Sequence, residues 1–405
     1  MTEPGPRLGR RLGLTDAVII GLGSMIGAGI FAALTPAAAA AGSGLLIGLA
    51  IAAVVAYCNA TSSARLAARY PESGGTYVYG RERLGRFWGY LAGWGFVVGK
   101  LASCAAMALT VGYYAWPGHP HAVAVAAVVA LTAVNYVGIQ RSALLTRVIV
   151  GLVLAVLVAV VVVIAASGHA DIDRVHIGGD PAGALRAAAL LFFAFAGYAR
   201  IATLGEEVRD PARTIPRAIP LALTITLLVY AAVAVAALTV LGSDGLAHAA
   251  APLADAVRAA GASWCEPVVR VGATVAALGS LLALILGVSR TTLAMARDRH
   301  LPQTLSAVHP RFRVPHRAEL AVGLVVAAIA ATTDVRGAIG FSSFAVLVYY
   351  AIANASAWTL GRRAVPGVGM VGCLVLALAL PVTSVISGAA VLAVGAVVYR
   401  IGRRR

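Results

Sequence analysis

Four glycines lie close together in residues 21–31, GLGSMIGAGIF, inside an apolar segment that runs from Ala17 to Ala41. Glycine in a helix interior costs about 1 kcal/mol relative to alanine. The spacing Gly23-x-x-x-Gly27 is typical of helices that approach a neighbour closely in a membrane. The other interpretation is that the helix is unwound here. A break would leave free amides at the start of the second half, where anions bind, and free carbonyls at the end of the first half.

A second segment of this kind covers residues 184–205, with Gly197 midway and Gly205 near its end. Breaks in the first and sixth spans are the pattern of transporters built from inverted repeats. Together the two breaks would form a receptor for a zwitterion, with the carboxylate on the amides and the ammonium on the carbonyls. A dinucleotide-binding loop is disfavoured, because Gly21-Leu22-Gly23 lacks the third glycine and a flanking strand.

Membrane-spanning helices must position these residues. The 405 residues are 60% hydrophobic and only 12% charged, whereas about 25% of the residues of a soluble domain are charged. Because backbone groups in lipid need internal partners, we expect an all-α integral membrane protein. Runs of about 20 apolar residues place about twelve spans, at residues 16–41, 44–64, 87–114, 121–138, 147–167, 184–205, 218–242, 267–289, 318–333, 338–360, 366–381 and 383–400.

The broken first and sixth spans predict a five-plus-five inverted repeat of the LeuT type, followed by two added C-terminal helices. Repeat one would cover about residues 16–167, repeat two about 184–360 and the added helices about 366–400. No connection is long enough to fold separately, so residues 1–405 are expected to form a single permease domain. The four cysteines are scattered without the spacing of metal ligands, and we expect no metal site.

The formal net charge of +16 does not indicate a nucleic acid as a partner, because the basic residues fall in short loops. With the N-terminus in the cytoplasm, 25 basic residues lie on the inner side and 5 on the outer side, while Lys100 and Arg200 lie within spans. This positive-inside asymmetry predicts cytoplasmic N- and C-termini and a multi-pass protein of the inner (plasma) membrane. No cleavable signal peptide is expected, because the N-terminal stretch MTEPGPRLGRRLGLTD is short and polar.

Four stretches resemble the amino acid–polyamine–organocation (APC) superfamily. GLGSMIGAGIF is similar to its first-helix motif, and FFAFAGYARIATLGEEVRDPARTIPRAI to its sixth helix and the following loop. LGVSRTTLAMARDRHLPQTLSAVHPRFRVPHRAEL resembles the eighth helix and loop of the cationic-amino-acid-transporter-like branch, and RYPESGGTYVYGRERLGRFWGYLAGW resembles the loop into helix three. The resemblance covers nearly the whole chain and implies a secondary amino acid carrier with alternating access, usually coupled to protons or to exchange.

The resemblance also implies the residues of the site. The substrate carboxylate would meet the amides of Gly27, Ala28 and Gly29, and the ammonium would meet the carbonyls of Met25, Phe193 and Ala196, beside the break at Gly197. Gating would fall to Phe193, Phe195 and Tyr198, with Arg200 beside them. The alternative is that these aromatic side chains only face lipid or core.

Lys100 is the only lysine of the chain and lies 13 residues after Phe87, where span three is expected to begin. That distance is about 20 Å along a helix, well inside an apolar layer about 30 Å thick. Lys100 either snorkels or pairs with carbonyls, or it exchanges a proton during transport. In some relatives a lysine in helix five is implicated in proton coupling, but Val153 stands at the matching position here. Lys100 is our candidate to replace it.

Two departures from the relatives concern the substrate. Gly99 stands where cationic-type relatives tend to carry a carboxylate in helix three, and Ala199 where many relatives have Asp or Glu in helix six. A cationic side chain would then lack a buried counter-charge, which is costly. We therefore expect a neutral or acidic amino acid, with a cationic amino acid or polyamine exchanger as the alternative.

Three other functions were considered. A channel would need polar rings lining a pore, and an enzyme would need a nucleophile–base pair or paired carboxylates; the spans show neither pattern. A non-transporting amino acid sensor with the carrier fold stays open. The expected carrier uses no cofactor beyond a proton gradient or an exchanged substrate, and functions as a monomer or homodimer.

Overall fold

The computed structural model of the chain describes residues 12–70, 74–138, 143–175, 178–198, 201 and 208–402. Within these residues the fold is helical, and the β pairing is limited to one isolated bridge between Leu12 and Val208. The first expected span is divided into three helices, α1 (Leu14–Met25), α2 (Ala28–Ala32) and α3 (Leu34–Ala41). The sixth begins as α9 (Pro181–Phe195) and continues as the 3₁₀ turn η3 (Ala196–Tyr198).

Each of the other expected spans also corresponds to a helix. In chain order these are α4 (Leu45–Arg69), α6 (Arg86–Ala115), α7 (Pro120–Tyr136), α8 (Ala143–Ala166), α11 (Pro211–His248), α13 (Glu266–Arg297), α14 (His316–Thr332), α15 (Val335–Trp358), α16 (Ala364–Ala379) and α17 (Val382–Gly402). Two shorter helices lie in connections, α5 (Thr76–Leu84) and α12 (Pro252–Ala259).

Length and composition identify the chain as a multi-pass membrane protein. Among the described residues, nine helical stretches are long and apolar enough to cross a membrane, and α7 and α16 are shorter apolar helices. The expectation of an all-α membrane protein is therefore confirmed. The number of twelve spans and the inverted repeat stay predictions.

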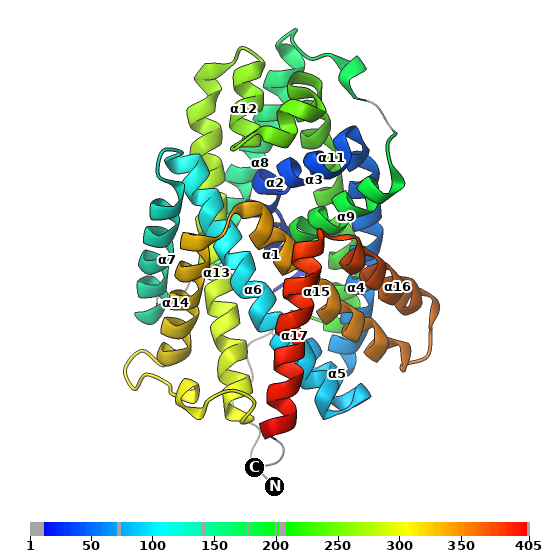
Figure 1. Cartoon of the computed structure of the whole chain (residues 1–405), viewed down its shortest axis with the longest axis vertical. Coiled ribbons are helices and arrows are strands. Elements are labelled where there is room, and N and C mark those ends of the chain that lie inside the picture. Colours follow the sequence, from blue (N-terminus) through cyan, green and yellow to red (C-terminus); the bar gives the residue numbers. More distant parts are fainter. Residues whose placement is uncertain are drawn as a thin grey trace.

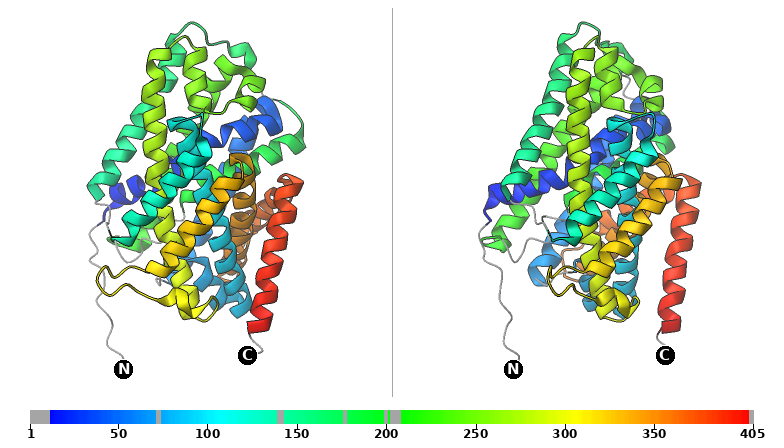
Figure 2. Two further views of the ribbon diagram at one scale, coloured as in Figure 1. Left: turned by 60° about the vertical axis from the view of Figure 1, so that its left-hand side comes forward. Right: turned by 90° about the vertical axis from the view of Figure 1, so that its left-hand side faces the viewer.

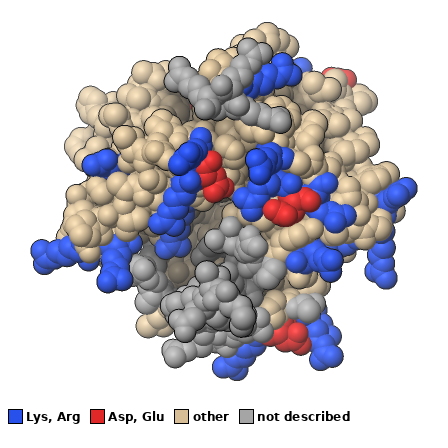
Figure 3. All heavy atoms as spheres, turned by 90° about the horizontal axis from the view of Figure 1, so that it is seen from below, with Lys and Arg blue, Asp and Glu red and all other residues tan. Residues whose placement is uncertain are grey.

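The helices form an elongated bundle (Figure 1). The end of α17, α5 and the end of α13 lie together at the bottom of this view, which we call the terminal end, and α12 lies at the opposite end. Seen from below, the terminal end carries many arginine side chains (Figure 3). Helix α17 runs along the outside of the bundle (Figure 2), and its Val382 and Ile386 side chains are 68% and 64% exposed.

Glycines allow the inner helices to approach closely. A Cβ added to Gly99 of α6 would lie 2.8 Å from the Ala345 Cβ of α15. The backbones of the two helices are therefore close to each other at this position. A carboxylate at this position, as in cationic-type relatives, would have to displace α15. The glycine therefore contributes to the packing of two spans that flank the broken helices.

Candidate substrate site at two broken helices

The first helix is broken between Met25 and Ala28, as the glycine pattern predicts. Ile26 (φ −81°, ψ 57°) and Gly27 (φ −109°, ψ −134°) leave the helical conformation, and the Gly27 amide donates to the Met25 carbonyl at 2.8 Å. Ala33 keeps helical dihedrals, so α2 and α3 form one helical arm over residues 28–41. Because this arm begins as a new helix at the break, its first backbone amides have no acceptor from a preceding helical turn.

The glycines of this stretch have different tasks. Gly21 and Gly23 lie within α1, where an added Cβ would meet Ile201 Cδ1 at 2.3 Å and Val150 Cγ2 at 2.7 Å. Gly27 lies at the break and faces α13, with Ser280 Oγ 1.9 Å from an added Cβ. A Cβ on Gly29 would lie 2.6 Å from Ala194 Cα of α9. Close packing and unwinding, the two interpretations of the motif, thus apply to different glycines.

The described part of the sixth span ends directly against the first break, and we call the end of α9 and the turn η3 the second break. Helix α9 ends at Phe195, and the Ala196 amide donates to the carbonyls of Phe192 and Phe193 as the chain tightens into η3. A Cβ on Gly197 would lie only 2.0 Å from the Ser24 carbonyl oxygen and 2.7 Å from the Met25 nitrogen. Glycine is required here because the two backbones touch. The predicted gating residue Arg200 lies outside the described residues, as does Ala199.

Backbone groups at the two breaks differ in the hydrogen bonds that they form. Within the described part of the chain, the amides of Ala28, Gly29 and Ile30 have no hydrogen-bond acceptor. The Met25 carbonyl, in contrast, is occupied by the Gly27 amide and by the Tyr230 hydroxyl, which approaches it to 2.6 Å. In this conformation the start of α2 is thus free to bind an anion, and the Met25 carbonyl is not free to bind an ammonium.

Tyr230 of α11 contacts both breaks and was not identified from the sequence. Its hydroxyl lies 2.6 Å from the Met25 carbonyl and 3.1 Å from the Ala194 carbonyl, so it links the ends of α1 and α9. Its side chain is fully buried. A tyrosine within an apolar run was the available signal, because a buried phenol needs a hydrogen-bond partner.

The expected gating aromatics are buried among other aromatics rather than facing lipid. Phe195 packs against Tyr230 with ring centroids 5.3 Å apart, and Tyr198 packs against Tyr350 of α15 at 5.2 Å. The Tyr350 hydroxyl lies 3.4 Å from the Ala196 carbonyl. Phe193 is also buried. This placement excludes the lipid-facing alternative for all three, but a buried aromatic can still be either core or gate.

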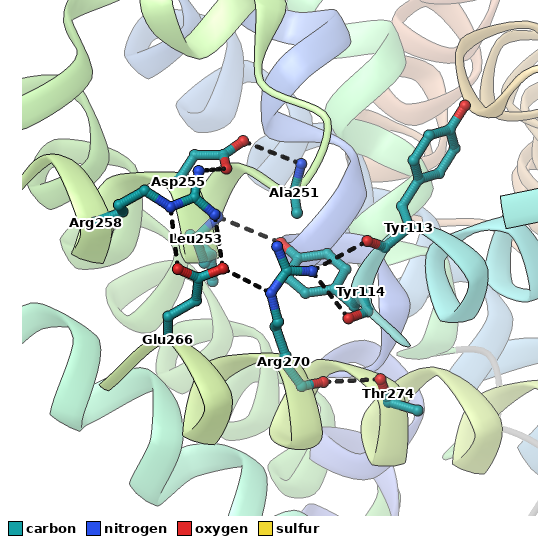
Figure 4. Close-up of polar contacts among 9 residues, drawn as sticks. All are labelled: Tyr113, Tyr114, Ala251, Leu253, Asp255, Arg258, Glu266, Arg270 and Thr274. Atoms are coloured by element: carbon teal, nitrogen blue, oxygen red, sulfur yellow. Dashed lines mark hydrogen bonds and ion pairs between the residues drawn. The ribbon is translucent and has the colours of Figure 1, made fainter. Parts of the chain in front are cut away.

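A polar cluster, which we call the α12 cluster, lies at the end opposite the terminal end (Figure 4). It consists of Asp255 and Arg258 of α12 and Glu266 and Arg270 of α13. Glu266 accepts from Arg258 at 2.6 Å and from Arg270 at 2.8 Å. Arg258 also donates to Asp255 at 3.1 Å. The Glu266 carboxylate raises the pKa of the Arg258 guanidinium above its ordinary value.

The α12 cluster is connected to the broken first helix through Tyr114 of α6. Arg270 donates to the Tyr114 carbonyl at 3.0 Å, and the Tyr114 hydroxyl donates to the Phe31 carbonyl of α2 at 3.0 Å. The Leu253 amide of α12 donates to the same hydroxyl at 3.3 Å. The second half of the broken helix is thus fastened to α6 and α12 at this end.

Lys100 lies in α6 and is buried, with 8% of its surface exposed. It stands seven residues after Gly93, whose added Cβ would lie 2.9 Å from Met295 of α13, so Lys100 shares the helix face that points to α13. Val111, which packs in one cluster with Ala28, is eleven residues further along, or about 16 Å. Lys100 is therefore buried on the terminal side of the break. Val153 is buried in the core that includes α1 and α8.

Glu319 of α14 is a buried carboxylate that the sequence placed only at a span margin. Its exposure is 0%, and neither oxygen has a hydrogen-bond partner within the described chain. His316 and Gly323 share its face of α14. The His316 ring lies 6.1 Å from that of Tyr136, and an added Cβ on Gly323 would meet Thr132 at 2.5 Å. The face of α14 that carries Glu319 therefore packs against α7, and the charge of Arg290 on α13 also acts on the carboxylate.

The sequence was compared with known proteins. Residues 16–394 match the amino acid permease family. An uncharacterized transporter of Mycobacterium tuberculosis is 75% identical over 404 residues, which cover 98% of this chain and 92% of that protein. The branched-chain amino acid permease BcaP of Bacillus subtilis is 25% identical, and the match covers 98% of this chain and 94% of the length of BcaP.

A plant relative is named for a different class of substrate. Cationic amino acid transporter 7, chloroplastic, of Arabidopsis thaliana is 28% identical over 87% of this chain and 65% of its own length. The family and the names of these relatives indicate a transporter rather than an enzyme. With nearly its whole length matched and two helices broken side by side in its interior, the chain belongs to the amino acid permease family of the APC superfamily and is an amino acid transporter.

Proposed function

We propose that the chain is a secondary active transporter that carries amino acids by alternating access, with the substrate held where α1/α2 and α9/η3 are broken. The observation that carries this proposal is the contact of the two breaks, at Gly197 and Ser24, beside the acceptor-free amides of Ala28 and Gly29. Amides at the start of a helix bind a carboxylate because donors and helix dipole act together. The residues proposed for binding are Met25, Gly27, Ala28, Gly29, Phe193, Ala196 and Gly197.

In this proposal Tyr230 supplies an exchange step at the ammonium site. Its hydroxyl proton occupies the Met25 carbonyl in this conformation, at 2.6 Å, and a substrate ammonium would take its place. One hydrogen bond would then replace another, and the Gly27 amide would keep its own bond to the same carbonyl, so the exchange would not lose a hydrogen bond worth about 0.5–1.5 kcal/mol. The proposed gates, Phe195 and Tyr198, pack against Tyr230 and Tyr350, respectively. A shift of Tyr230 would therefore change the packing of Phe195.

The α12 cluster supports alternating access. It fastens α2 to α6, α12 and α13 through Tyr114 and Arg270, and opening this end requires those contacts to separate. At the terminal end, a groove of about 920 Å³ opens between α4 and α11, with Arg65, Arg69 and Arg83 on its walls. We propose that the conformation is closed at the α12 end, which faces outward, and that the terminal end is cytoplasmic in the inner membrane of the cell.

A neutral or acidic amino acid is the favoured substrate. The described side chains that contact the two breaks carry no charge, and the buried carboxylate of Glu319 lies on α14, on the face that packs against α7. A cationic side chain would therefore have no carboxylate partner there. Relatives are named for branched-chain and for cationic amino acids, so a cationic exchanger is the alternative. A sensor or channel is the alternative of another class.

Coupling to protons is proposed through Lys100. It is a buried cation on the terminal side of the break, and Val153 leaves α8 without the lysine on which helix-five coupling depends in some relatives. An intramembrane ionisable residue marks an ion or substrate pathway by default. Snorkelling or pairing with carbonyls is the structural alternative for Lys100.

The proposal is tested by transport in proteoliposomes. Purified protein is supplied with a panel of labelled amino acids, with and without an inward proton gradient, and Lys100→Ala is measured beside the parent. Gradient-driven uptake of neutral or acidic substrates that is lost in the variant supports both the substrate class and the coupling role. Arginine or lysine as the best substrate would contradict the charge argument. Counterflow that needs no gradient and survives Lys100→Ala indicates an exchanger in which Lys100 is structural.

A further inference from the structure

A groove of about 630 Å³ lies at the terminal end, between the start of α6, the loop after α13 and the end of α17. Its walls combine two guanidinium groups, Arg86 and Arg299, with the aromatic rings of Trp88, Tyr90 and Tyr399. The Tyr90 and Tyr399 rings lie 4.9 Å apart and join α6 to α17. The groove is remote from the broken helices and takes no part in the transport site.

The two arginines are available to an anion. Both are exposed, and neither forms an ion pair with any carboxylate in the described part of the chain. Asp298 also lines the groove, but it already accepts from the Tyr77 hydroxyl and lies 3.5 Å from Arg81. The negative charge of Asp298 is therefore balanced by Arg81, which does not line the groove.

The start of α6 adds further donors. Gly85 precedes this 30-residue helix with φ 103°, and it supplies no side chain to cap the first amides. Uncapped amides and the positive end of the helix dipole both favour an anion. Burial keeps the pKa of His300 below its ordinary value, so its ring is neutral at pH 7 and contributes no positive charge of its own.

The surroundings of the groove are those of a lipid rather than of a free ion. Trp88 is 45% exposed at the start of α6, and tryptophan favours the membrane–water interface. The adjacent face of α17 is apolar and open, with Val394 and Ile401 each 55% exposed. An occupant with a phosphate at one end and hydrocarbon at the other matches both surfaces.

We propose that this groove binds the headgroup of an anionic phospholipid, with Arg86 and Arg299 holding the phosphate and the acyl chains lying along α17. Basic pockets between spanning helices bind anionic headgroups for the same reason. Neutral phosphatidylcholine also carries a phosphate, but its choline cation would face two guanidinium groups. The groove should therefore select for net negative charge. This inference does not depend on which substrate is transported.

The experiment measures binding of fluorescent phosphatidylglycerol to the full chain in detergent micelles, with phosphatidylcholine and inorganic phosphate as competitors. The double variant Arg86→Gln/Arg299→Gln is compared with Arg311→Gln/Arg313→Gln, which removes the same charge from exposed sites in the loop before α14. We expect roughly 25-fold weaker binding in the groove variant, since each basic residue near a lipid surface is worth about fivefold, and no more than a twofold change in the control.

Three results would overturn the proposal: equal competition by phosphatidylcholine, displacement by millimolar phosphate, or equal losses in both double variants. Displacement by phosphate would identify a soluble anion as the ligand, and equal losses would identify general charge attraction. Arg86→Lys/Arg299→Lys keeps the charge and should retain most of the binding, which separates loss of the site from loss of the fold.

Discussion

The substitution Gly197→Ala tests whether contact of the two broken helices is needed for transport. The added Cβ would lie 2.0 Å from the Ser24 carbonyl oxygen, where ordinary contact begins at 3.4 Å. The neighbouring Met25 nitrogen is 2.7 Å away. Because these are backbone atoms, no rotamer change can relieve the overlap. Helix α1 and η3 must therefore separate by about 1.4 Å, the difference between 2.0 Å and 3.4 Å, because overpacking is relieved by backbone shifts.

Such overpacking costs typically about 1–3 kcal/mol in a well-packed interior. The separation also moves the Met25 carbonyl away from the position proposed for the substrate ammonium, and a hydrogen bond to a charged group is worth about 1.5–3 kcal/mol. We expect the initial rate of substrate counterflow to fall at least tenfold, while the protein remains folded with a lowered melting temperature. Both quantities are measured on the same preparation, in proteoliposomes and in detergent.

Gly287→Ala is the matched control, because Gly287 also lies within a spanning helix, α13, and no described atom lies within 4 Å of its added Cβ. This variant should transport at the parental rate and melt at the same or a slightly higher temperature, since alanine is the better helix former. A Gly197→Ala protein that transports as fast as the Gly287→Ala protein would refute the argument that the two breaks form the site together.

Three further predictions concern residues around the site and at the two ends. Tyr230→Phe removes the hydroxyl from the Met25 carbonyl, which keeps the Gly27 amide as a donor, and should lower the unfolding free energy by about 0.5–1.5 kcal/mol; an unchanged melting temperature would argue against a link between the broken helices. Glu266→Gln weakens the ion pairs of the α12 cluster, and a partly exposed ion pair is worth up to about 1 kcal/mol. The α12 end should therefore open about fivefold more often, and the buried, neighbouring Cys265 should be alkylated about fivefold faster. An unchanged alkylation rate would show that the cluster does not hold that end closed. Burial, opposed in part by Asp298, lowers the pKa of His300 in the folded protein, so the unfolded chain binds the proton more readily. The stability that this ring contributes is therefore present above pH 6.5 and lost as the pH falls through its lower folded pKa, and the parent should lose more stability than His300→Gln between pH 7 and pH 5; parallel melting curves would contradict this.

The sequence predicts the helical fold and the place of the first break because both depend on local patterns. Apolar runs of spanning length and four glycines in eleven residues are visible without any partner. The pattern could not assign each glycine its task, because Gly23 faces Val150 and Gly27 faces Ser280 through contacts between distant parts of the chain. Whether a given glycine unwinds or packs is decided by the neighbour it meets.

Contacts between distant parts of the chain also explain why Tyr230 and Glu319 were not identified from the sequence. Tyr230 joins two carbonyls that lie 205 and 36 residues away in the chain, and nothing near it in sequence marks it. Glu319 looked like a span-margin residue, but packing of α14 against α7 removes it completely from solvent. Burial of a charge is a tertiary property, which hydropathy along one helix does not record.

The most direct test of the central claim is counterflow competition with analogues that lack one charge of the zwitterion. Excess unlabelled best substrate is trapped inside proteoliposomes, and entry of the labelled substrate is measured against its amide, which lacks the carboxylate, and its N-acetyl form, which lacks the ammonium. If the amides of Ala28 and Gly29 and the carbonyls at the breaks bind the two charges, each analogue should compete at least about tenfold more weakly than the amino acid, because each loses a charge-assisted contact worth about 1.5–3 kcal/mol. Equal competition by either analogue would contradict the account.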